Sequence, residues 1–208
     1  MQNALSPRQD RSIKTHRALL DALHRLLQTE AFEALTVAQI AAEAGLTTGA
    51  IYRRFKDKRA LLGASFERFL EQSRALQEER AAAMRDMDDA AKLDYMIRST
   101  LDFTIPYIPL MRAASALNDQ PSFDLMLAAR NASADWLAGS LETSALDATE
   151  LRARTRFVLR TVSAVIRDTL FAGPGKGRPS AELEDMVVQL TEMAIAHLQI
   201  RIPGVDSR

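Results

Sequence analysis

The sequence predicts an all-α fold, and three observations carry that prediction. Apolar residues make up 47% of the 208 positions, which is ample material for a buried core. Glycine and proline are scarce, with 8 and 7 copies, while residues that favour helices intrinsically are abundant. Aromatic and β-branched residues form no alternating runs, so we expect no strand.

The N-terminal third predicts a loose arm followed by four helices. Residues 1–11 are polar and are expected to form the arm. Apolar residues then recur at helical spacing, namely Ile13, Leu20, Leu23 and Leu27. The predicted helices cover about 12–29, 36–44, 47–54 and 57–80. Gly45 follows the second helix, where a left-handed residue ends a helix best.

The remaining residues predict a body of longer helices. The acidic stretch 86–89 is expected to be a linker. Helices are predicted over about 90–105, 121–142, 147–172 and 180–202. Pro106 and Pro109 interrupt the first of these, since proline lacks the amide that a helix interior needs. The sequence GPGKGRP at 173–179 is expected to be a loop.

Charge and composition exclude several classes of protein. The chain has no cysteine, which removes disulfides and thiolate metal sites and suits a reducing compartment. The start lacks the apolar core of a secretory signal, and no apolar run approaches the roughly 18 residues that span a bilayer. We therefore expect a cytoplasmic protein. Residues 1–60 carry a net charge of +4 and the rest −4, as expected if only the first part meets phosphate.

The segment TVAQIAAEAGLTTGAIYRRFKDKRALL, residues 36–62, carries the strongest functional signal. Thr36 and Gln39 have the spacing of a capping box, and Thr47 is expected to cap the next helix in the same way. Leu35 before the first helix and Leu46 before the second are placed to act as hydrophobic staples. Two short capped helices separated by a glycine turn predict a helix-turn-helix.

Helical spacing assigns the residues of the second short helix to two faces. Ile51 and Phe55 share the inner face. The outer face offers Thr48, Gly49, Tyr52 and Arg53, which suit a major groove better than an apolar core. Glycine inside a helix costs up to about 1 kcal/mol relative to alanine, and close approach to DNA would offset that cost.

Lys58 and Arg59 are expected at the start of the fourth helix, where the helix dipole disfavours cations. A bound phosphate would remove this conflict, because it would meet the free amides and the lysine together. Arg53, Arg54 and Arg59 could instead be solvated charges that attract phosphates without reading bases.

These residues resemble the DNA-binding domain of the TetR family of repressors. The resemblance covers residues 12–62, the head, with an amphipathic first helix followed by FEALTVAQIAAEAGLTTGAIYRRFKDKRALL. It implies a helical homodimer whose second short helix enters the major groove. Arg53 and Arg54 depart from the family pattern, so operator contacts are expected to differ. The residues expected to contact DNA are Thr36, Thr47, Thr48, Gly49, Ala50, Tyr52, Arg53 and Lys58.

The head is expected to continue through a connecting helix to about residue 80. Residues 81–208 are then expected to form the body, which binds an effector and dimerises. Larger apolar side chains of the body are core by default, but broken helices near Pro106 leave room for a ligand cavity. The residues expected to line it are Phe103, Tyr107, Met111, Phe123, Met126 and Trp136. Asp102, Arg112 or Asn118 could orient a polar group of an effector that we expect to be uncharged and mostly apolar.

The last two predicted helices have apolar faces wider than one contact surface needs. Burial within one chain is the simple explanation. The family resemblance implies instead a four-helix dimer interface with two-fold pairing. The residues expected at that interface are Val158, Val162, Val165, Leu190, Met193 and Leu198.

These features predict a ligand-responsive transcriptional regulator, most simply a repressor, that binds a near-palindromic operator in double-stranded DNA. A small-molecule binding protein with a vestigial head remains open as the alternative. Neither a membrane partner nor a cofactor is expected. His16, His24 and His197 lack partners at ligand spacing, so no metal site is expected. The GPGKG loop lacks the pattern of a phosphate-binding loop, and no catalytic set of side chains can be proposed.

Overall fold

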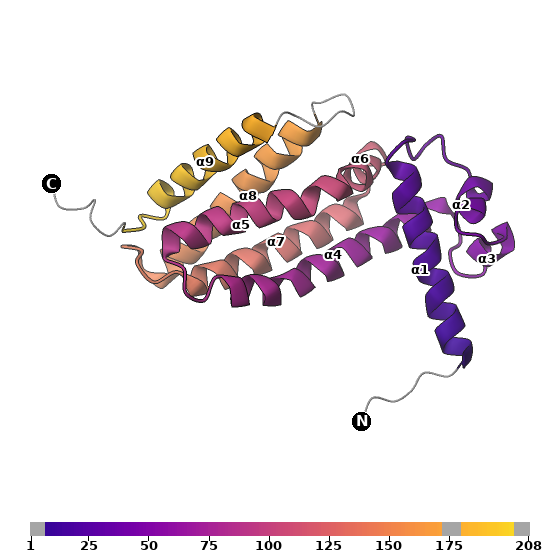
Figure 1. The fold of residues 1–208 in the computed structure, drawn as a ribbon, viewed down its shortest axis with the longest axis horizontal. Coiled ribbons are helices and arrows are strands. Elements are labelled where there is room, and N and C mark those ends of the chain that lie inside the picture. Colours follow the sequence, from indigo (N-terminus) through magenta and orange to yellow (C-terminus); the bar gives the residue numbers. More distant parts are fainter. Residues whose placement is uncertain (1–6, 172–179, 202–208) are drawn as a thin grey trace. The chain divides into compact units, whose positions relative to one another are not determined.

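The computed structural model describes residues 7–171 and 180–201, with side chains from residue 11 onward. Helices dominate these residues, and the only pairing of extended backbone described is an isolated bridge between Ser144 and Ile200. The all-α prediction is therefore confirmed. In chain order (Figure 1) the elements are α1 (Pro7–Leu27), α2 (Val37–Glu43), α3 (Thr48–Tyr52), α4 (Lys58–Ala83), α5 (Asp89–Thr104), the 3₁₀ turn η1 (Ile105–Tyr107), α6 (Ile108–Ala116), α7 (Gln120–Ser140), α8 (Ala148–Phe171) and α9 (Ser180–His197).

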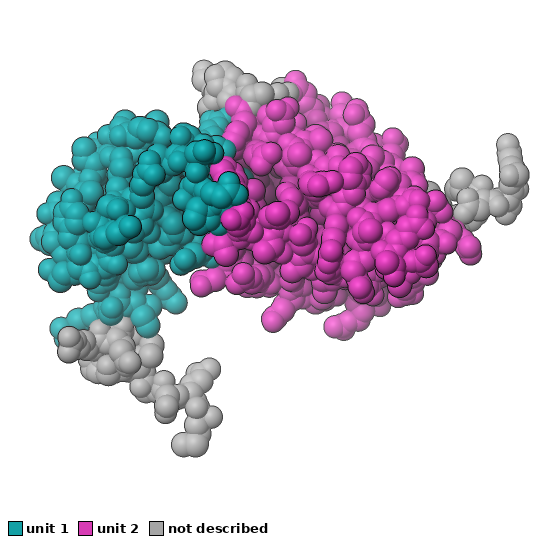
Figure 2. Space-filling model, turned by 180° about the vertical axis from the view of Figure 1, so that it is seen from behind, with its two compact units in different colours: residues 1–69, 109–122 teal, residues 70–108, 123–208 magenta. Residues whose placement is uncertain are grey.

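The chain divides into two compact units, coloured separately in Figure 2. The first unit comprises residues 1–69 and 109–122, and the second comprises residues 70–108 and 123–208. The predicted head, 12–62, lies within the first unit. Helix α4 contributes residues to both units, as its length of 26 residues allows.

Three helices build the core of the head in the first unit. Helix α1 packs against α2, and α2 against α3. Leu23, Ile40 and Ile51, one from each helix, are fully buried. On the surface, Arg25 of α1 donates to a Glu43 carboxylate oxygen at 2.5 Å, which holds the end of α2 against α1. The apolar residues that recur at helical spacing in the sequence thus face the core of the head.

The second unit has its own core, in which α5 packs against α9 and α8 also packs against α9. Buried apolar residues from α5, α7, α8 and α9 form one cluster, with Leu93, Leu137, Ile166 and Leu198 among its least exposed members. Helix α4 joins this unit through polar contacts: the Gln77 amide donates to the Ser133 hydroxyl of α7 at 2.8 Å.

The predicted N-terminal arm is wrong at residues 7–11, whereas the predicted acidic linker is confirmed up to Asp88. Helix α1 begins at Pro7, whose missing amide costs nothing in the first turn. The predicted acidic linker ends in a helix start, because the Asp88 carboxylate accepts from the Ala91 amide at 2.8 Å and caps α5. Asp89 lies inside α5 and is 2% exposed.

Asp89 and Lys92 are both buried, and together they join α5 to the end of α7 and to the α7–α8 connection. The Oδ2 of Asp89 accepts from the backbone amides of Glu142 at 2.7 Å and Thr143 at 2.6 Å, and its Oδ1 accepts from Lys92 at 3.1 Å. Lys92 also donates to the Ser140 carbonyl at 2.8 Å. Burial alone would raise the pKa of Asp89, but these hydrogen bonds outweigh it and lower the pKa. The network fixes the α7–α8 connection to the start of α5.

The prolines interrupt the chain as predicted, but they do not leave a long irregular segment. Helix α5 ends at Thr104, one 3₁₀ turn holds Pro106, and α6 follows at once. Pro109 lies in the first turn of α6, where no intrahelical amide bond is required. Helix α6 was missed in the sequence because the prolines suggested a break without a restart. The predicted loop 173–179 lies outside the described residues.

Candidate functional site

The start of α2 carries the predicted capping box. The Gln39 amide donates to the Thr36 hydroxyl at 3.1 Å, and the Thr36 amide donates to the Gln39 side-chain carbonyl at 2.8 Å. Thr36 itself remains exposed at the surface. The predicted staple residues Leu35 and Ile40 are both buried. This local bonding fixes where α2 begins.

The turn between α2 and α3 contains one confirmed prediction and one error. Gly45 has φ of +67°, the left-handed conformation predicted from its place after α2. Thr47 occupies the residue before α3 in extended conformation, but its side chain makes no capping hydrogen bond. The predicted second cap is therefore wrong, and the Thr47 hydroxyl is exposed and not used by the helix.

Helix α3 presents opposite chemistry on its two faces. Ile51 is fully buried, whereas Tyr52 is 58% exposed although it is a large aromatic residue. Thr48 and Arg53 are exposed beside it. Ala50 is 4% exposed, so its side chain belongs to the inner face and is not available for the predicted DNA contact. Helix α3 has only five residues, and its buried face consists of Ala50 and Ile51.

Gly49 lies on the exposed face of α3, and the fold does not require a glycine there. A Cβ added at this position would meet nothing closer than the Arg53 guanidinium at 3.6 Å and the Thr47 hydroxyl at 3.8 Å, both ordinary contacts. Its φ is not in the left-handed region. The absence of a side chain at 49 therefore has no internal packing reason in the described structure.

Lys58 does not face outward as predicted. Its Nζ donates to the carbonyls of Phe32 at 2.7 Å, Leu35 at 2.6 Å and Glu33 at 3.3 Å. It also lies 4.5 Å from the centroid of the Phe32 ring. Since an ammonium has three protons, these carbonyls saturate it. Lys58 ties the α1–α2 connection to the start of α4, which argues against its predicted role as a phosphate ligand.

The predicted conflict between Lys58 and the dipole of α4 is resolved within the chain. The Asp57 carboxylate accepts from the Ala60 amide at 2.8 Å, so an acidic residue caps the helix before the cations. The signal was visible in the sequence, because aspartate three residues before Ala60 has N-cap spacing. A bound phosphate is therefore not needed to explain this helix start.

The residues predicted to line a ligand cavity are divided between the two units. Met111 belongs to the first unit, and the other five belong to the second. The ring centroids of Phe103 and Tyr107 lie 5.4 Å apart, and the Tyr107 hydroxyl donates to the Gln72 side-chain oxygen. Trp136 packs against the buried cluster of the second unit. Of the three polar residues proposed to orient a ligand, Asp102 and Asn118 are exposed.

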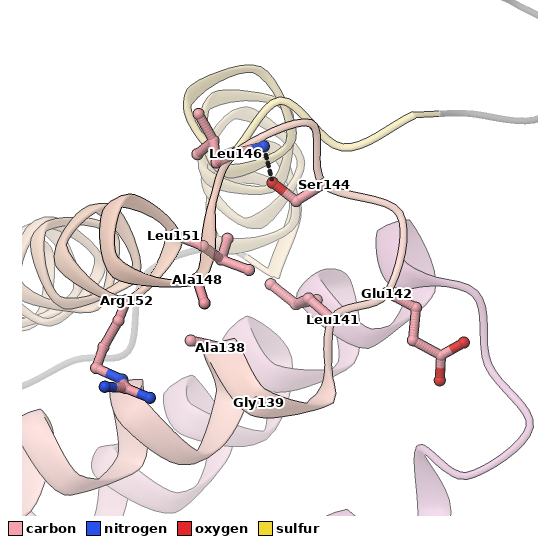
Figure 3. A pocket seen from close by; sticks show the side chains of 9 residues that line it. All are labelled: Ala138, Gly139, Leu141, Glu142, Ser144, Leu146, Ala148, Leu151 and Arg152. Carbon is pink, nitrogen blue, oxygen red and sulfur yellow. Dashed lines mark hydrogen bonds between the residues drawn. The ribbon is translucent and has the colours of Figure 1, made fainter.

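A pocket of about 250 Å³ lies beside the α7–α8 connection, and none of the predicted ligand residues lines it. Figure 3 shows apolar side chains such as Leu141 and Leu151 around it, with Arg152 on one side and Glu142 turned away. Ligand sites commonly measure about 300 to 1,000 Å³. This pocket is below that range and has no convergent polar groups, so it makes a weak ligand site.

Four of the six predicted interface residues are buried within the single chain. Val158 and Val162 of α8, Leu190 of α9 and Leu198 belong to the core cluster of the second unit. They cannot also form an exposed contact surface, so their assignment to an interface is wrong and the simple explanation holds. Val165 and Met193 are half-buried. The exposed large apolar residues on these helices are Phe157 of α8, at 44%, and Val188 of α9, at 42%.

Within the described ranges, no group of three or more histidine or acidic side chains could hold a metal ion. None of the described helices is long and apolar enough to cross a membrane.

Comparison with known proteins finds a family model that matches the head. Residues 19–64 match the family model of bacterial regulatory proteins, tetR family. No curated protein matches the sequence. A solved protein of Mesorhizobium loti MAFF303099 assigned to the TetR-family transcriptional regulators has a TM-score of 0.70 at 18% identity, covering 89% of this chain and 97% of that one.

Two further solved structures share the fold. NalD, the secondary repressor of the MexAB-OprM multidrug efflux pump in Pseudomonas aeruginosa, has a TM-score of 0.57 at 20% identity and covers 93% of this chain and 99% of its own. The dihydroxyacetone kinase operon activator DhaS has a TM-score of 0.60 at 16% identity, covering 89% and 96%. Residues 19–64 thus match the tetR family of bacterial regulatory proteins, and the chain shares its fold with these solved structures.

Proposed function

We propose that the chain is a sequence-specific repressor that is released from its operator by a small, mostly apolar ligand. The observation that carries the DNA-binding part is the outer face of α3. Tyr52, Thr48 and Arg53 are exposed there, while Ile51 anchors the opposite face in the core. A rigid short helix with a polar, aromatic and cationic outer face suits the major groove, which admits one helix.

Gly49 supports the same assignment. The chain has room for a side chain at 49, yet none is present, and glycine weakens a helix by up to about 1 kcal/mol relative to alanine. Close approach of the α3 backbone to the edge of a base pair or to a phosphate would account for it. The exposed Thr47 hydroxyl, which makes no capping hydrogen bond, would contact the sugar–phosphate backbone and help fix the register. The Thr36 hydroxyl would do the same in exchange for the proton that it donates to the Gln39 side chain at 2.7 Å.

The proposed contact set therefore differs from the predicted one in two places. Ala50 leaves it because its side chain is buried, and Lys58 leaves it because three carbonyls already bind its ammonium. Thr36, Thr47, Thr48, Gly49, Tyr52 and Arg53 remain. Of these, Tyr52 and Arg53 have the longest reach toward base edges.

A dimer would explain how so small a head selects a site. Two copies of α3 must lie about 34 to 36 Å apart to enter successive major grooves, which calls for a near-palindromic operator. We propose that α8 and α9 form the two-fold interface around the exposed side chains Phe157 and Val188. The dimer would exist in two states, one with the heads at the spacing that DNA requires and one with the heads spread apart. A ligand that binds the spread state more tightly would raise the population of that state and release DNA.

Repression is the simplest outcome of such binding, because a dimer on a promoter excludes polymerase without any further contact. The sign of regulation varies among proteins of this fold, since NalD is named a repressor and DhaS an activator. The proposed regulator works in the cytoplasm with the DNA and needs neither a cofactor nor a catalytic residue.

Selection of bound fragments from the source genome tests the DNA-binding proposal. The wild type is compared with Tyr52→Ala/Arg53→Ala, which clears the outer face of α3 and leaves every described buried residue in place. Arg74→Ala, at an exposed position of α4 in the second unit, removes one cation as a control.

Wild type and control should enrich a few near-palindromic sites whose affinity falls steeply with salt, and the double variant should enrich none. If the wild type enriches nothing with or without cell metabolites, the regulator proposal fails. A small-molecule binding protein with a vestigial head would then take its place.

Sedimentation of Phe157→Glu/Val188→Glu tests the dimer. The wild type should sediment as a dimer at micromolar concentration and the variant as a monomer, because two charges at the centre of an apolar interface oppose association. Leu127→Glu introduces a charge at an equally exposed apolar position of α7 and should leave the dimer intact. A wild-type monomer would refute the interface.

A further inference from the structure

Arg80 of α4 is a buried cation in the second unit. Its side chain is 3% exposed. Nε donates to the Ser99 hydroxyl at 2.8 Å, and one terminal nitrogen donates to the Thr100 hydroxyl at 3.2 Å, both on α5. Among the described residues it forms no ion pair, in contrast to Arg98 and Arg156, each of which binds a carboxylate.

The two hydroxyls do not neutralise the guanidinium. Each donates its own proton to the Met96 carbonyl, Thr100 at 2.7 Å and Ser99 at 3.3 Å, so their lone pairs are left for Arg80. Burial lowers the pKa of Arg80 to about 10, and the nearby Tyr95 opposes this only in part. A buried charge bound only by neutral groups is costly, and an apolar residue of similar volume would avoid that cost.

Arg80 lies on a strip of polar side chains in a part of the second unit that also buries apolar residues. Gln77, one turn earlier on α4, donates to Ser133 of α7 at 2.8 Å and continues the strip. Met84, one turn later on the same face, is buried, as are Met96 and Ile97 of α5. In the described part of the chain, the second terminal nitrogen of Arg80 makes no hydrogen bond.

We propose that Arg80 anchors the effector of this regulator and that the effector is an apolar molecule with a single carboxylate. The two terminal nitrogens of a guanidinium match the two oxygens of a carboxylate. One negative charge balances the one buried positive charge, whereas a phosphate ester with a charge of about −2 would leave an excess. This inference rests on the proposed sensing role of the second unit and replaces the expectation of an uncharged effector.

Calorimetric titration of the full chain with matched probes tests the inference. The probes are octanoate and 4-phenylbutanoate, each compared with its neutral primary amide, which keeps the shape and removes the charge. The proteins are the wild type, Arg80→Met, Arg80→Lys and the control Arg98→Met, which removes an exposed arginine already paired with Glu184.

In the wild type and Arg98→Met, at least one acid should bind at least about tenfold more tightly than its amide, the effect of a charge-assisted bidentate pair. Arg80→Met should lose this preference and melt no lower than the wild type, since it removes an uncompensated buried charge. Arg80→Lys should keep part of the preference for the acid over the amide. Because acid and amide are compared in the wild type first, the test does not depend on any variant folding.

Equal binding of acid and amide, no binding of either acid, or a preference that survives in Arg80→Met would each overturn the inference. Operator binding is measured on the same samples, so the two proposals fail separately. A wild type that binds DNA but neither acid refutes only the carboxylate effector. Arg80-dependent binding of an acid by a protein that binds no DNA refutes only the regulator.

Discussion

The head in the first unit and the helical core of the second unit treat their cations in opposite ways. In the head, Lys58 turns inward and is saturated by three backbone carbonyls, so the outer face is left to Tyr52 and Arg53. In the second unit, Arg80 is buried without a negative partner among the described residues. A cation near a predicted site can thus be structural, and the cation that we propose as the effector anchor lies far from any motif. The two cations differ in their hydrogen bonds: Lys58 has a carbonyl for each of its three protons, whereas one terminal nitrogen of Arg80 has no described hydrogen bond.

The buried acid of the second unit gives the largest expected effect. Asp89→Asn should lower the free energy of unfolding by about 3 to 5 kcal/mol at pH 7, because it removes the nearer and buried charge partner of Lys92 and leaves only the exposed Glu142 carboxylate at 3.9 Å. Chemical denaturation of the two proteins measures the difference.

The same pair of proteins makes a prediction about pH. Hydrogen bonds hold the pKa of Asp89 below its ordinary value of about 3.9, so the ionised network stabilises the fold above that pH. The contribution is lost as pH falls through the lower folded-state pKa. The gap between wild type and Asp89→Asn should therefore shrink in acid, and a gap that is constant down to about pH 2 would contradict the assigned network.

Lys58→Ala should cost about 2 to 3 kcal/mol of stability, since three carbonyls lose a charged donor. Tyr52→Ala should change stability by less than about 0.5 kcal/mol, because the side chain is largely exposed. Denaturant titration of both variants compares a structural residue with a surface residue of the same head. A Lys58→Ala protein as stable as the wild type would return Lys58 to the DNA-contact set.

The two threonines before the short helices should behave differently. Thr36→Ala should lose about 1 kcal/mol, because Thr36 caps α2, whereas Thr47→Ala should lose almost none. Thermal melts monitored by circular dichroism separate the two variants. Equal losses would mean that the Thr47 side chain does cap α3 in solution.

Gly49→Ala should change stability in the opposite direction to the variants above. The position has room for a methyl group, so the variant should be more stable by up to about 1 kcal/mol. Its operator affinity should nevertheless fall about tenfold or more, because the methyl group blocks close approach. Paired melting and anisotropy measurements test both parts. Unchanged affinity would remove Gly49 from the interface.

The sequence predicted the elements well and the roles of individual cations poorly. Helical periodicity, the Thr36–Gln39 box and Gly45 are local signals, and they placed α2, the turn and α3 within about one or two residues. The three carbonyls around Lys58 come from residues 32 to 35, more than 20 positions away, and no local pattern indicates them.

The same limit explains the errors in the second unit. Val158 and Leu190 lie on wide apolar faces, but only the packing of α5 against α9 and of α8 against α9 decides which part of each face is buried. Arg80 directly follows the exposed residues Glu78 and Glu79 of α4, so its burial cannot be predicted from the local sequence before α5 is in place. Asp88 and Asp89 appeared to be a solvated linker because their partners lie in the α7–α8 connection and in the first turn of α5.

The most direct test of the account is the ratio of affinities for the selected operator and for a scrambled duplex at one salt concentration. Anisotropy titrations compare the wild type with Tyr52→Ala/Arg53→Ala. The wild type should prefer the operator by a factor of about 1,000 or more, and the variant should bind both duplexes with the same weak affinity. A variant that keeps the preference would show that sequence is read elsewhere on the molecule, which contradicts the central claim.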